Sequence, residues 1–330
     1  MTMTTPTRPR AQALRQAAVR ATLAPSVHNT QPWRFVIGAD TLEVHADRTR
    51  QLRVLDPTGR QLLISCGCAL LNARVALAGA GHDAVVERFP DPTRPTLLAR
   101  VRIGDEPVDW RPLGKLDPVI EHRQSNRRRF SDDPVPPDLV RDLVAAAAAE
   151  QAQLFEITQP EHRSATARLT QDADRQQNAD PAYRAELRAW TSADANRRDG
   201  VPAIAVPHVD GGAGDDIPIR DFDTSGMGWL PGKTRSSMDQ CLLLLGTTAD
   251  RPAGWLRAGE ALERVLLEAT LAGYAASLFT QVIEVPHTRY LLRTALGLDM
   301  NPHVLLRIGH APKTPASRRR RLVDVLSESA

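Results

Sequence analysis

Residues 67–81 read GCALLNARVALAGAG, and residues 259–273 read GEALERVLLEATLAG. The two stretches share their first Gly, the Ala and Leu that follow it, and the final Gly, and each shared residue recurs 192 positions later. Apolar residues recur at spacings of three and four in both, as in a buried helix, and a glycine suits the end of such a helix. The match indicates two copies of one structural unit, although chance similarity between two Ala-rich helices explains it equally well.

The segments around these two helices predict a chain that mixes helices and strands. A Pro- and charge-rich joint at 105–118 separates a first part from a second part, and 200–232, with seven glycines and four prolines, reads as a long loop. Hydrophobic periodicity predicts helices over 12–23 and 138–150, a polar helical stretch over 164–198, and strands over 34–37, 42–45, 84–89, 96–103, 153–158 and 304–308.

Composition sets limits on the class of protein. The chain has 330 residues, of which 42% are hydrophobic and 25% charged, as in a globular protein of about two domains. Aromatic residues make up only 4%, which argues against a base-stacking nucleic-acid surface. Three cysteines without framework spacing favour a reducing cytoplasm, and we expect no signal peptide, membrane span or metal site.

The sharpest polar string is APSVHNTQPWRF at residues 24–35. Hydroxyl and amide side chains stand between two prolines, and Pro25 and Pro32 hold the backbone extended or turned. Such a loop can offer fixed hydrogen-bond donors and acceptors to a planar polar ligand. An Asx-rich turn that leads into the strand at Phe35 explains the same residues.

Two basic strings are the other candidates for a binding site. In EHRQSNRRRF at 121–130, Arg123, Ser125 and Arg127 alternate, so an extended segment presents them on one face, which suits a phosphate. A solvated basic linker is the alternative. The string SRRRR at 317–321 reads by itself as a solvated tail or a nucleic-acid patch.

Together these strings resemble the flavin-dependent nitroreductase superfamily, and in particular its Acg-type branch, in which two nitroreductase-like halves are fused in one chain. The string at 24–33 resembles the FMN loop, 123–130 resembles the Arg-x-Ser-x-Lys/Arg opening motif with one extra residue before Phe130, and 259–277 resembles the central helix and the strand beneath the flavin. The resemblance implies an α+β fold of two pseudo-repeat halves, each a mainly antiparallel sheet with surrounding helices, that mimic a nitroreductase dimer. We place the halves at 1–118 and 119–330.

The resemblance also implies where FMN binds. Each half keeps a different part of the site, so we expect one FMN per chain and a second position that is empty or filled by side chains. Arg123, Ser125, Arg318 and Arg320 are expected at the phosphate, and Arg127 at the pyrimidine edge of the ring. The expected cofactor-binding residues are Pro25, Ser26, His28, Asn29, Thr30, Gln31, Pro32, Arg123, Ser125, Arg127, Leu278, Thr280, Gln281, Ser317, Arg318, Arg319 and Arg320.

The implied function is an NAD(P)H-dependent FMN oxidoreductase that passes hydride to a quinone or nitroaromatic acceptor. No catalytic side chain is assigned, because the flavin carries the chemistry. The alternative is a flavin-sequestering protein with little turnover, in which 200–232 is a lid. We expect a monomer or weak homodimer, with FMN, NAD(P)H and an electron-poor small molecule as partners, and no nucleic acid.

Overall fold

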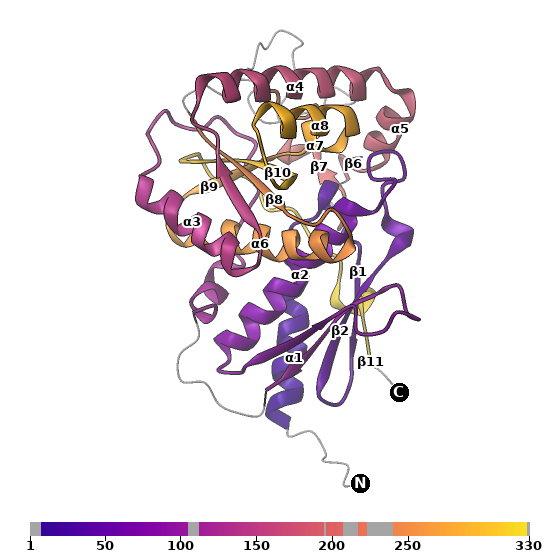
Figure 1. The fold of residues 1–330 in the computed structure, drawn as a ribbon. Coiled ribbons are helices and arrows are strands. Elements are labelled where there is room, and N and C mark those ends of the chain that lie inside the picture. Colours follow the sequence, from indigo (N-terminus) through magenta and orange to yellow (C-terminus); the bar gives the residue numbers. More distant parts are fainter. Residues whose placement is uncertain (1–7, 105–111, 195, 207–216, 223–239, 329–330) are drawn as a thin grey trace.

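Two halves of the same topology form the molecule (Figure 1). The computed structural model describes residues 8–104, 112–194, 196–206, 217–222 and 240–328. The first half contains α1 (Arg8–Ala21), β1 (Trp33–Ile37), β2 (Thr41–Ala46), α2 (Arg60–Gly79), β3 (Ala84–Arg88) and β4 (Leu97–Ile103). The second half contains α3 (Pro137–Ala149), β5 (Gln153–Glu156), β8 (Cys241–Thr247), α6 (Pro252–Leu271), β9 (Ala275–Phe279) and β10 (Asn301–Gly309).

The two sheets have matching strand orders. The first runs β1-β2-β4-β3 and the second β5-β8-β10-β9, and each of these pairings is antiparallel. Each sheet also has a register shift between its two central strands, at Val44/His45 against β4 and at Pro302/Val304 against β8. A bulge at the same place in two sheets is a feature that duplication would preserve. The expected fold class, two fused α+β pseudo-repeats, is confirmed.

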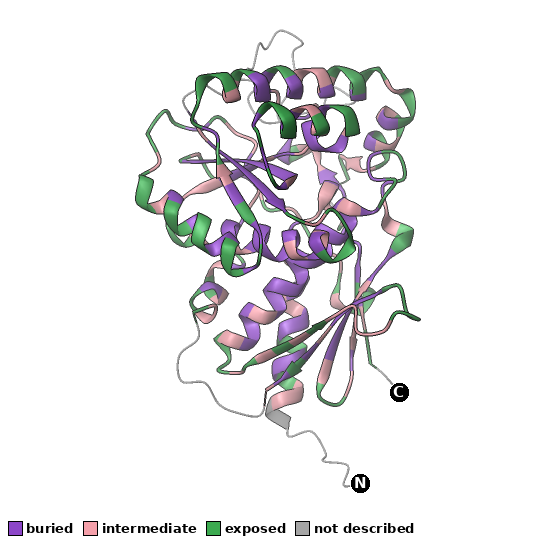
Figure 2. Cartoon of the chain, viewed as in Figure 1, coloured by how far each residue is buried: buried purple, intermediate pink, exposed green. Residues whose placement is uncertain are grey.

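The halves meet where α2 packs on α6, and both helices are buried there (Figure 2). Gly67 and Gly259 face each other: a Cβ on Gly67 would lie 2.8 Å from the Gly259 Cα and would overlap the Leu256 carbonyl. A Cβ on Gly259 would in turn overlap the carbonyl of Ile64. Ile64 and Leu256 are also 192 positions apart, so the contact is reciprocal, as at a two-fold dimer interface. The repeat glycines therefore mark a pseudo-two-fold axis.

One long insertion distinguishes the second half from the first. A turn of three residues joins β1 to β2, whereas 84 residues, 157–240, join β5 to β8. The insertion carries α4 (Pro160–Ala179), α5 (Pro181–Ala189), β6 (Thr191–Ser192) and β7 (Val201–Pro202). Its α4 packs on α7 (Gln281–Glu284) and α8 (Pro286–Ala295) at the end of the molecule far from the first sheet (Figure 1).

The C-terminal segment crosses from the second half to the first. After β10 it passes the 24–32 loop and ends as β11 (Leu326–Glu328), which pairs in parallel with β1. The Phe35 amide donates to the Val325 carbonyl at 2.7 Å. This crossing brings the basic string at 317–321 to the junction of the halves.

Among the described residues, α2 alone is long and apolar enough to cross a bilayer, and most of it is buried between the halves. Such burial identifies the core helix of a folded domain rather than a span.

Candidate functional site

The loop between α1 and β1 has an unusual backbone. His28, Asn29 and Gln31 have φ of 48°, 54° and 51°, in the left-handed region that costs a non-glycine residue about 1–2 kcal/mol. Two hydrogen bonds hold the loop in this shape. Within the loop, the backbone N–H of Gln31 donates to Ser26 Oγ at 2.9 Å, and the backbone N–H of Val27 donates to Ser65 Oγ of α2 at 3.3 Å. Strain that neighbouring structure maintains is typical of ligand sites.

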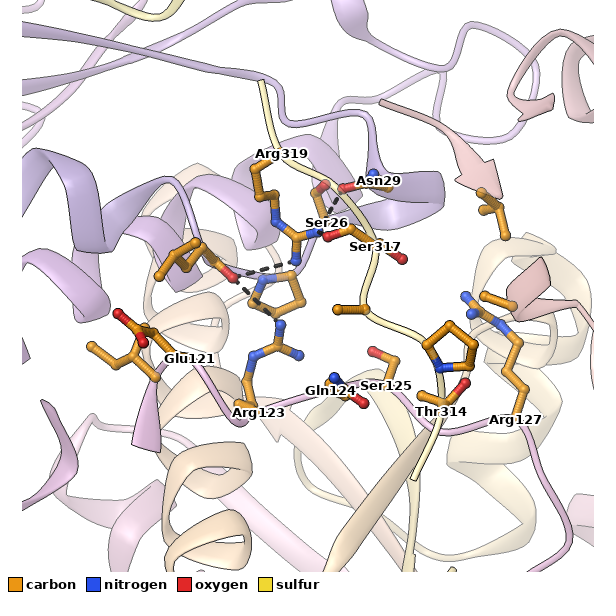
Figure 3. Close-up of a pocket in the computed structure, with 17 residues that line it drawn as sticks. Ser26, Asn29, Glu121, Arg123, Gln124, Ser125, Arg127, Thr314, Ser317 and Arg319 are labelled. Atoms are coloured by element: carbon orange, nitrogen blue, oxygen red, sulfur yellow. Dashed lines mark hydrogen bonds between the residues drawn. The ribbon is translucent and has the colours of Figure 1, made fainter. Parts of the chain in front are cut away.

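Two adjoining cavities lie beside this loop, at the junction of the halves. The first, the arginine cavity, has a volume of about 190 Å³ (Figure 3). The second, the inner cavity, has a volume of about 90 Å³. Pro25, Ser26, Ser125 and Arg127 line both, so the two form one elongated site.

Two buried guanidinium groups converge in the arginine cavity (Figure 3). Arg123 Nη2 and Arg319 Nη2 donate to the same acceptor, the Leu23 carbonyl, at 3.4 and 3.3 Å. Arg123 Nη1 and Arg319 Nε have no hydrogen-bond partner within the described residues. Burial, and next the charge of Arg123, lower the pKa of Arg319 to about 9. Two close cations with unused donors suit a doubly charged anion.

The basic string contributes one arginine to this cavity rather than two. Arg319 lines it, together with Ser317. Arg318 is exposed, and its carbonyl accepts from Asn29 Nδ2 at 3.1 Å. Arg320 turns away: its amide donates to Gln31 Oε1 at 2.7 Å and its Nη2 donates to the Asp324 carbonyl at 2.8 Å. Arg318 and Arg320, which the resemblance placed at the phosphate, do not line the cavity, whereas Arg319 between them does.

The inner cavity has mixed walls. Ile64 and Cys68 of α2, Leu262 of α6, and Leu278 and Thr280 at the end of β9 lie around it. Burial raises the pKa of the Cys68 thiol well above its usual range, so this sulfur stays protonated. A pocket that combines apolar walls with hydrogen-bonding side chains suits a flat ring with a polar edge.

Residues of the insertion close the inner cavity. Arg220 Nη1 donates a hydrogen bond to His28 Nε2 at 3.1 Å. Arg220 Nη2 donates to Thr280 Oγ1 at 3.0 Å and to Glu284 Oε1 at 2.6 Å. Burial, and next the charges of Arg220 and Arg127, hold the pKa of His28 well below its usual range. Phe222 meets His28 edge-on, with ring centroids 5.3 Å apart. A neutral histidine that accepts at Nε2 carries its proton on Nδ1.

Four of the predicted residues, three in the loop and one in α7, line neither cavity. Thr30 and Gln31 are buried, and the Thr30 carbonyl accepts from Arg50 Nε at 2.5 Å. The Pro32 carbonyl accepts from Cys66 Sγ at 3.3 Å, and Gln281 Nε2 donates to Asp174 Oδ1 at 2.7 Å. The other predicted residues besides Arg318 and Arg320 line one cavity or both: Pro25, Ser26, His28, Asn29, Arg123, Ser125, Arg127, Leu278, Thr280, Ser317 and Arg319.

Sequence reasoning did not identify several residues that line the cavities. Cys68 and Leu262 belong to the repeat helices, and their position in the repeat was the available signal. Phe222 and Arg220 both lie in the segment expected to be a lid, but Arg220 carried no signal of its own, because its place depends on how the insertion folds back. The lining residues outside the expected cofactor-binding set are Leu23, Val27, Gln61, Ile64, Ser65, Cys68, Ile120, Glu121, Gln124, Val201, Ala205, Ile219, Arg220, Phe222, Leu262, Val304, Thr314, Pro315 and Ala316.

The symmetry-related position of the inner cavity holds charged side chains. Glu260 stands 192 positions after Cys68, and Thr280 stands 192 positions after Arg88. Glu260 is fully buried, and Arg88 Nε and Nη2 donate to its two oxygens at 2.7 Å. A carboxylate and a guanidinium therefore replace two residues that line the site.

More charges complete this network between the halves. Arg74 of α2 donates to Glu260 at 2.8 Å and to Glu150 at 2.6 Å, and Arg264 donates to Glu150 at 2.8 Å. Only residues 150–152 join α3 to β5, so the second half has no counterpart of the 24–32 loop.

Comparison with known proteins gives close relatives in sequence. No family model matches the chain. A protein of Mycobacterium tuberculosis H37Rv named "Putative NAD(P)H nitroreductase Rv3131" is 35% identical over 323 residues, which cover 96% of this chain and 92% of that protein. Another protein of this strain, "Putative NAD(P)H nitroreductase acg", is 32% identical over 323 residues, 94% of each chain. Relatives that share the whole length of this chain thus carry the name nitroreductase.

Solved structures with a similar fold carry the same name. The FMN-dependent nitroreductase NfnB of Mycobacterium smegmatis in complex with NADPH is 15% identical, with a TM-score of 0.39, and the match covers 66% of this chain and 98% of that one. A Bacteroides fragilis nitroreductase with bound FMN is 13% identical, with a TM-score of 0.38, covering 62% and 93%.

Proposed function

Because this chain belongs to the nitroreductase family, we propose that it is an FMN-dependent oxidoreductase that passes hydride from NAD(P)H to an electron-poor acceptor such as a quinone or nitroaromatic. The observation that carries the proposal is the pair of adjoining cavities. One end offers the guanidinium groups of Arg123 and Arg319, and the other a smaller cavity with both apolar and polar walls.

The residues present fit FMN part by part. The unused donors of Arg123 and Arg319 suit the phosphate, because guanidinium pairs with phosphate through parallel hydrogen bonds. Ser26 and Ser125 line both cavities, so they lie between the two ends and suit the hydroxyl groups of the ribityl chain. The apolar walls of the inner cavity suit the ring.

When bound, FMN supplies the transfer of hydride in both directions. The protein binds, orients and tunes it. Arg127 lies where both cavities meet, and burial and then the charge of Arg220 lower the pKa of Arg127 to about 10, so this guanidinium is still cationic at neutral pH. A cation beside the ring favours negative charge on its reduced form. We assign no side chain as acid or base, since solvent can supply the proton.

We further propose one FMN per chain and a monomeric protein. The buried network around Glu260 and Arg88 supports a single site, because the ring would have to displace paired charges at the second position. The second half takes the place that a partner subunit takes in a dimer, which supports the monomer.

One observation favours the alternative, a flavin-sequestering protein with little turnover. The insertion reaches both cavities, with Val201 and Ala205 at the arginine cavity and Arg220 and Phe222 at the inner one. A cover at this position would restrict the approach of a nicotinamide to the ring.

The test is anaerobic addition of NADH, and separately of NADPH, to the FMN-loaded protein while the flavin absorbance is recorded. Loss of the flavin absorbance as fast as an enzyme turns over supports the oxidoreductase. A bound flavin that neither donor bleaches supports sequestration. Failure to bind FMN would refute both.

A further inference from the structure

A buried carboxylate stands behind the arginine cavity. Glu263 of α6 is fully buried, and its Oε1 lies 3.4 Å from Arg123 Nε, whose side chain is 4% exposed. Glu263 does not line either cavity itself. It therefore touches the proposed phosphate site only through the guanidinium groups.

The groups that face Glu263 come from three segments, and two of these carry charge. Arg123 belongs to the stretch before α3, and Arg319 belongs to the C-terminal crossing. Asn72 and Cys68 of α2 are the facing groups on the neighbouring helix, and both are neutral. Glu263 thus faces two cations; the other charged residues that line the arginine cavity are Arg127 and Glu121, and Glu121 pairs with Arg20.

A phosphate dianion changes this balance. Two guanidinium groups neutralise a dianion completely, so no countercharge is left for an ionised carboxylate a few ångströms behind them. In a buried site, an anion close to a carboxyl group raises the pKa of that carboxyl group, as in paired carboxylates. The neutral acid is then the favoured form of the side chain.

We propose that Glu263 is the proton-linked counter-ion of the phosphate site: it balances the two arginines when the site is empty and takes up a proton when a phosphomonoester dianion binds. This inference rests on the proposed function, since it assumes that the cavity holds the phosphate of FMN. It assigns a role in cofactor binding to a residue that contacts the cofactor only indirectly, as a positioning residue for Arg123.

The ionisation of Glu263 in the empty site agrees with this role. Burial raises the pKa of Glu263 to about 7, although the nearby charge of Arg123, the neighbouring Asn72 side chain, and the charge of Arg319 each lower it. The added dianion raises it further. FMN affinity is therefore highest below the pKa of the empty protein and falls as the pH rises above it, because a proton must be bound along with the ligand.

The experiment measures FMN and riboflavin binding by calorimetry at pH 7.0 and 8.0, in two buffers with different ionisation enthalpies. In this range the phosphate is already a dianion, since its second pKa is about 6. We expect FMN binding to take up nearly one proton at pH 8.0 and to weaken by roughly fivefold from pH 7.0 to 8.0. Riboflavin, which lacks the phosphate, should show neither effect.

Two variants separate Glu263 from other titrating groups. Glu263→Gln should abolish both the proton uptake and the pH dependence and should tighten FMN binding at pH 8.0. Glu268→Gln, a matched change on the same helix at a residue that pairs with Lys115, should behave as the wild type. Proton uptake that persists in Glu263→Gln, or its absence in the wild type, overturns the inference and leaves the FMN site intact. If neither FMN nor riboflavin binds, the proposed function itself fails.

Discussion

Asn29 shows how one residue serves both interpretations of the polar string. Its Nδ2 donates to the carbonyls of Gly200 and Arg318, at 3.0 and 3.1 Å, as a residue of a structural turn would. Its Oδ1 accepts from Arg319 Nη1 at 3.1 Å, and Asn29 lines the arginine cavity. Asn29 therefore both holds the turn and lines the cavity. Residue chemistry alone could not decide between these two roles.

The neighbouring arginines allow a matched test. Arg319→Ala and Arg123→Ala each remove a charge-assisted contact, which costs about 2–3 kcal/mol, or roughly a hundredfold in FMN affinity. Arg318→Ala, one residue away but outside the cavity, should change the affinity little. Titrations followed by flavin fluorescence measure all three dissociation constants.

Riboflavin is the control ligand for these variants. Because it has no phosphate, its affinity should be nearly the same in all of them. Equal losses for FMN and riboflavin would indicate a folding role for the arginines, and an equal effect of Arg318→Ala would show that only net charge matters.

At the scale of elements, the two repeat helices were visible in the sequence, whereas their close contact through Gly67 and Gly259 emerged only from the structure. Two other elements left no such trace. The apolar run at 241–245 reads equally as helix core or as strand, and it forms β8. The three residues of β11 pair with β1, almost 300 positions earlier, and local patterns contain no information on such pairings.

The packing of α2 on α6 predicts the effect of one methyl group. Gly259→Ala would place a Cβ against the Ile64 carbonyl, and the helices would have to separate. We expect the free energy of unfolding to fall by about 1–3 kcal/mol, the usual cost of overpacking. Leu271→Ala, at the exposed end of the same helix, should cost much less in the same urea titration. A Gly259→Ala protein as stable as the wild type would contradict the close contact.

The insertion predicts an effect on rates. Phe222 closes the inner cavity, so Phe222→Ala should speed both FMN release and bleaching by NAD(P)H severalfold, as expected when a gating group is removed. Trp190→Ala changes an aromatic residue of the same insertion that lines neither cavity, and serves as the control. If stopped-flow rates are unchanged while thermal stability falls, the segment is structural. Of the expected lid at 200–232, residues 207–216 and 223–232, with Met227 and Trp229, lie outside the described residues.

At the scale of the whole molecule, the sequence predicts the fold class and the general location of the site but not which arginine enters it. The resemblance placed Arg318 and Arg320 at the phosphate, yet Arg319 is the arginine of this segment that lines the cavity, and the Arg320 amide donates to Gln31 instead. The charges at the second position were also not assigned, because Glu260 reads as a solvated residue until its helix is packed against the other half.

The central claim is that one chain forms one FMN site from two halves. The direct measurement saturates the purified protein with FMN, removes free flavin by gel filtration, and divides the flavin released on denaturation by the protein concentration. The account predicts a ratio of one. A ratio near two would show that the Glu260 position also binds flavin, and a ratio near zero would contradict the FMN site altogether.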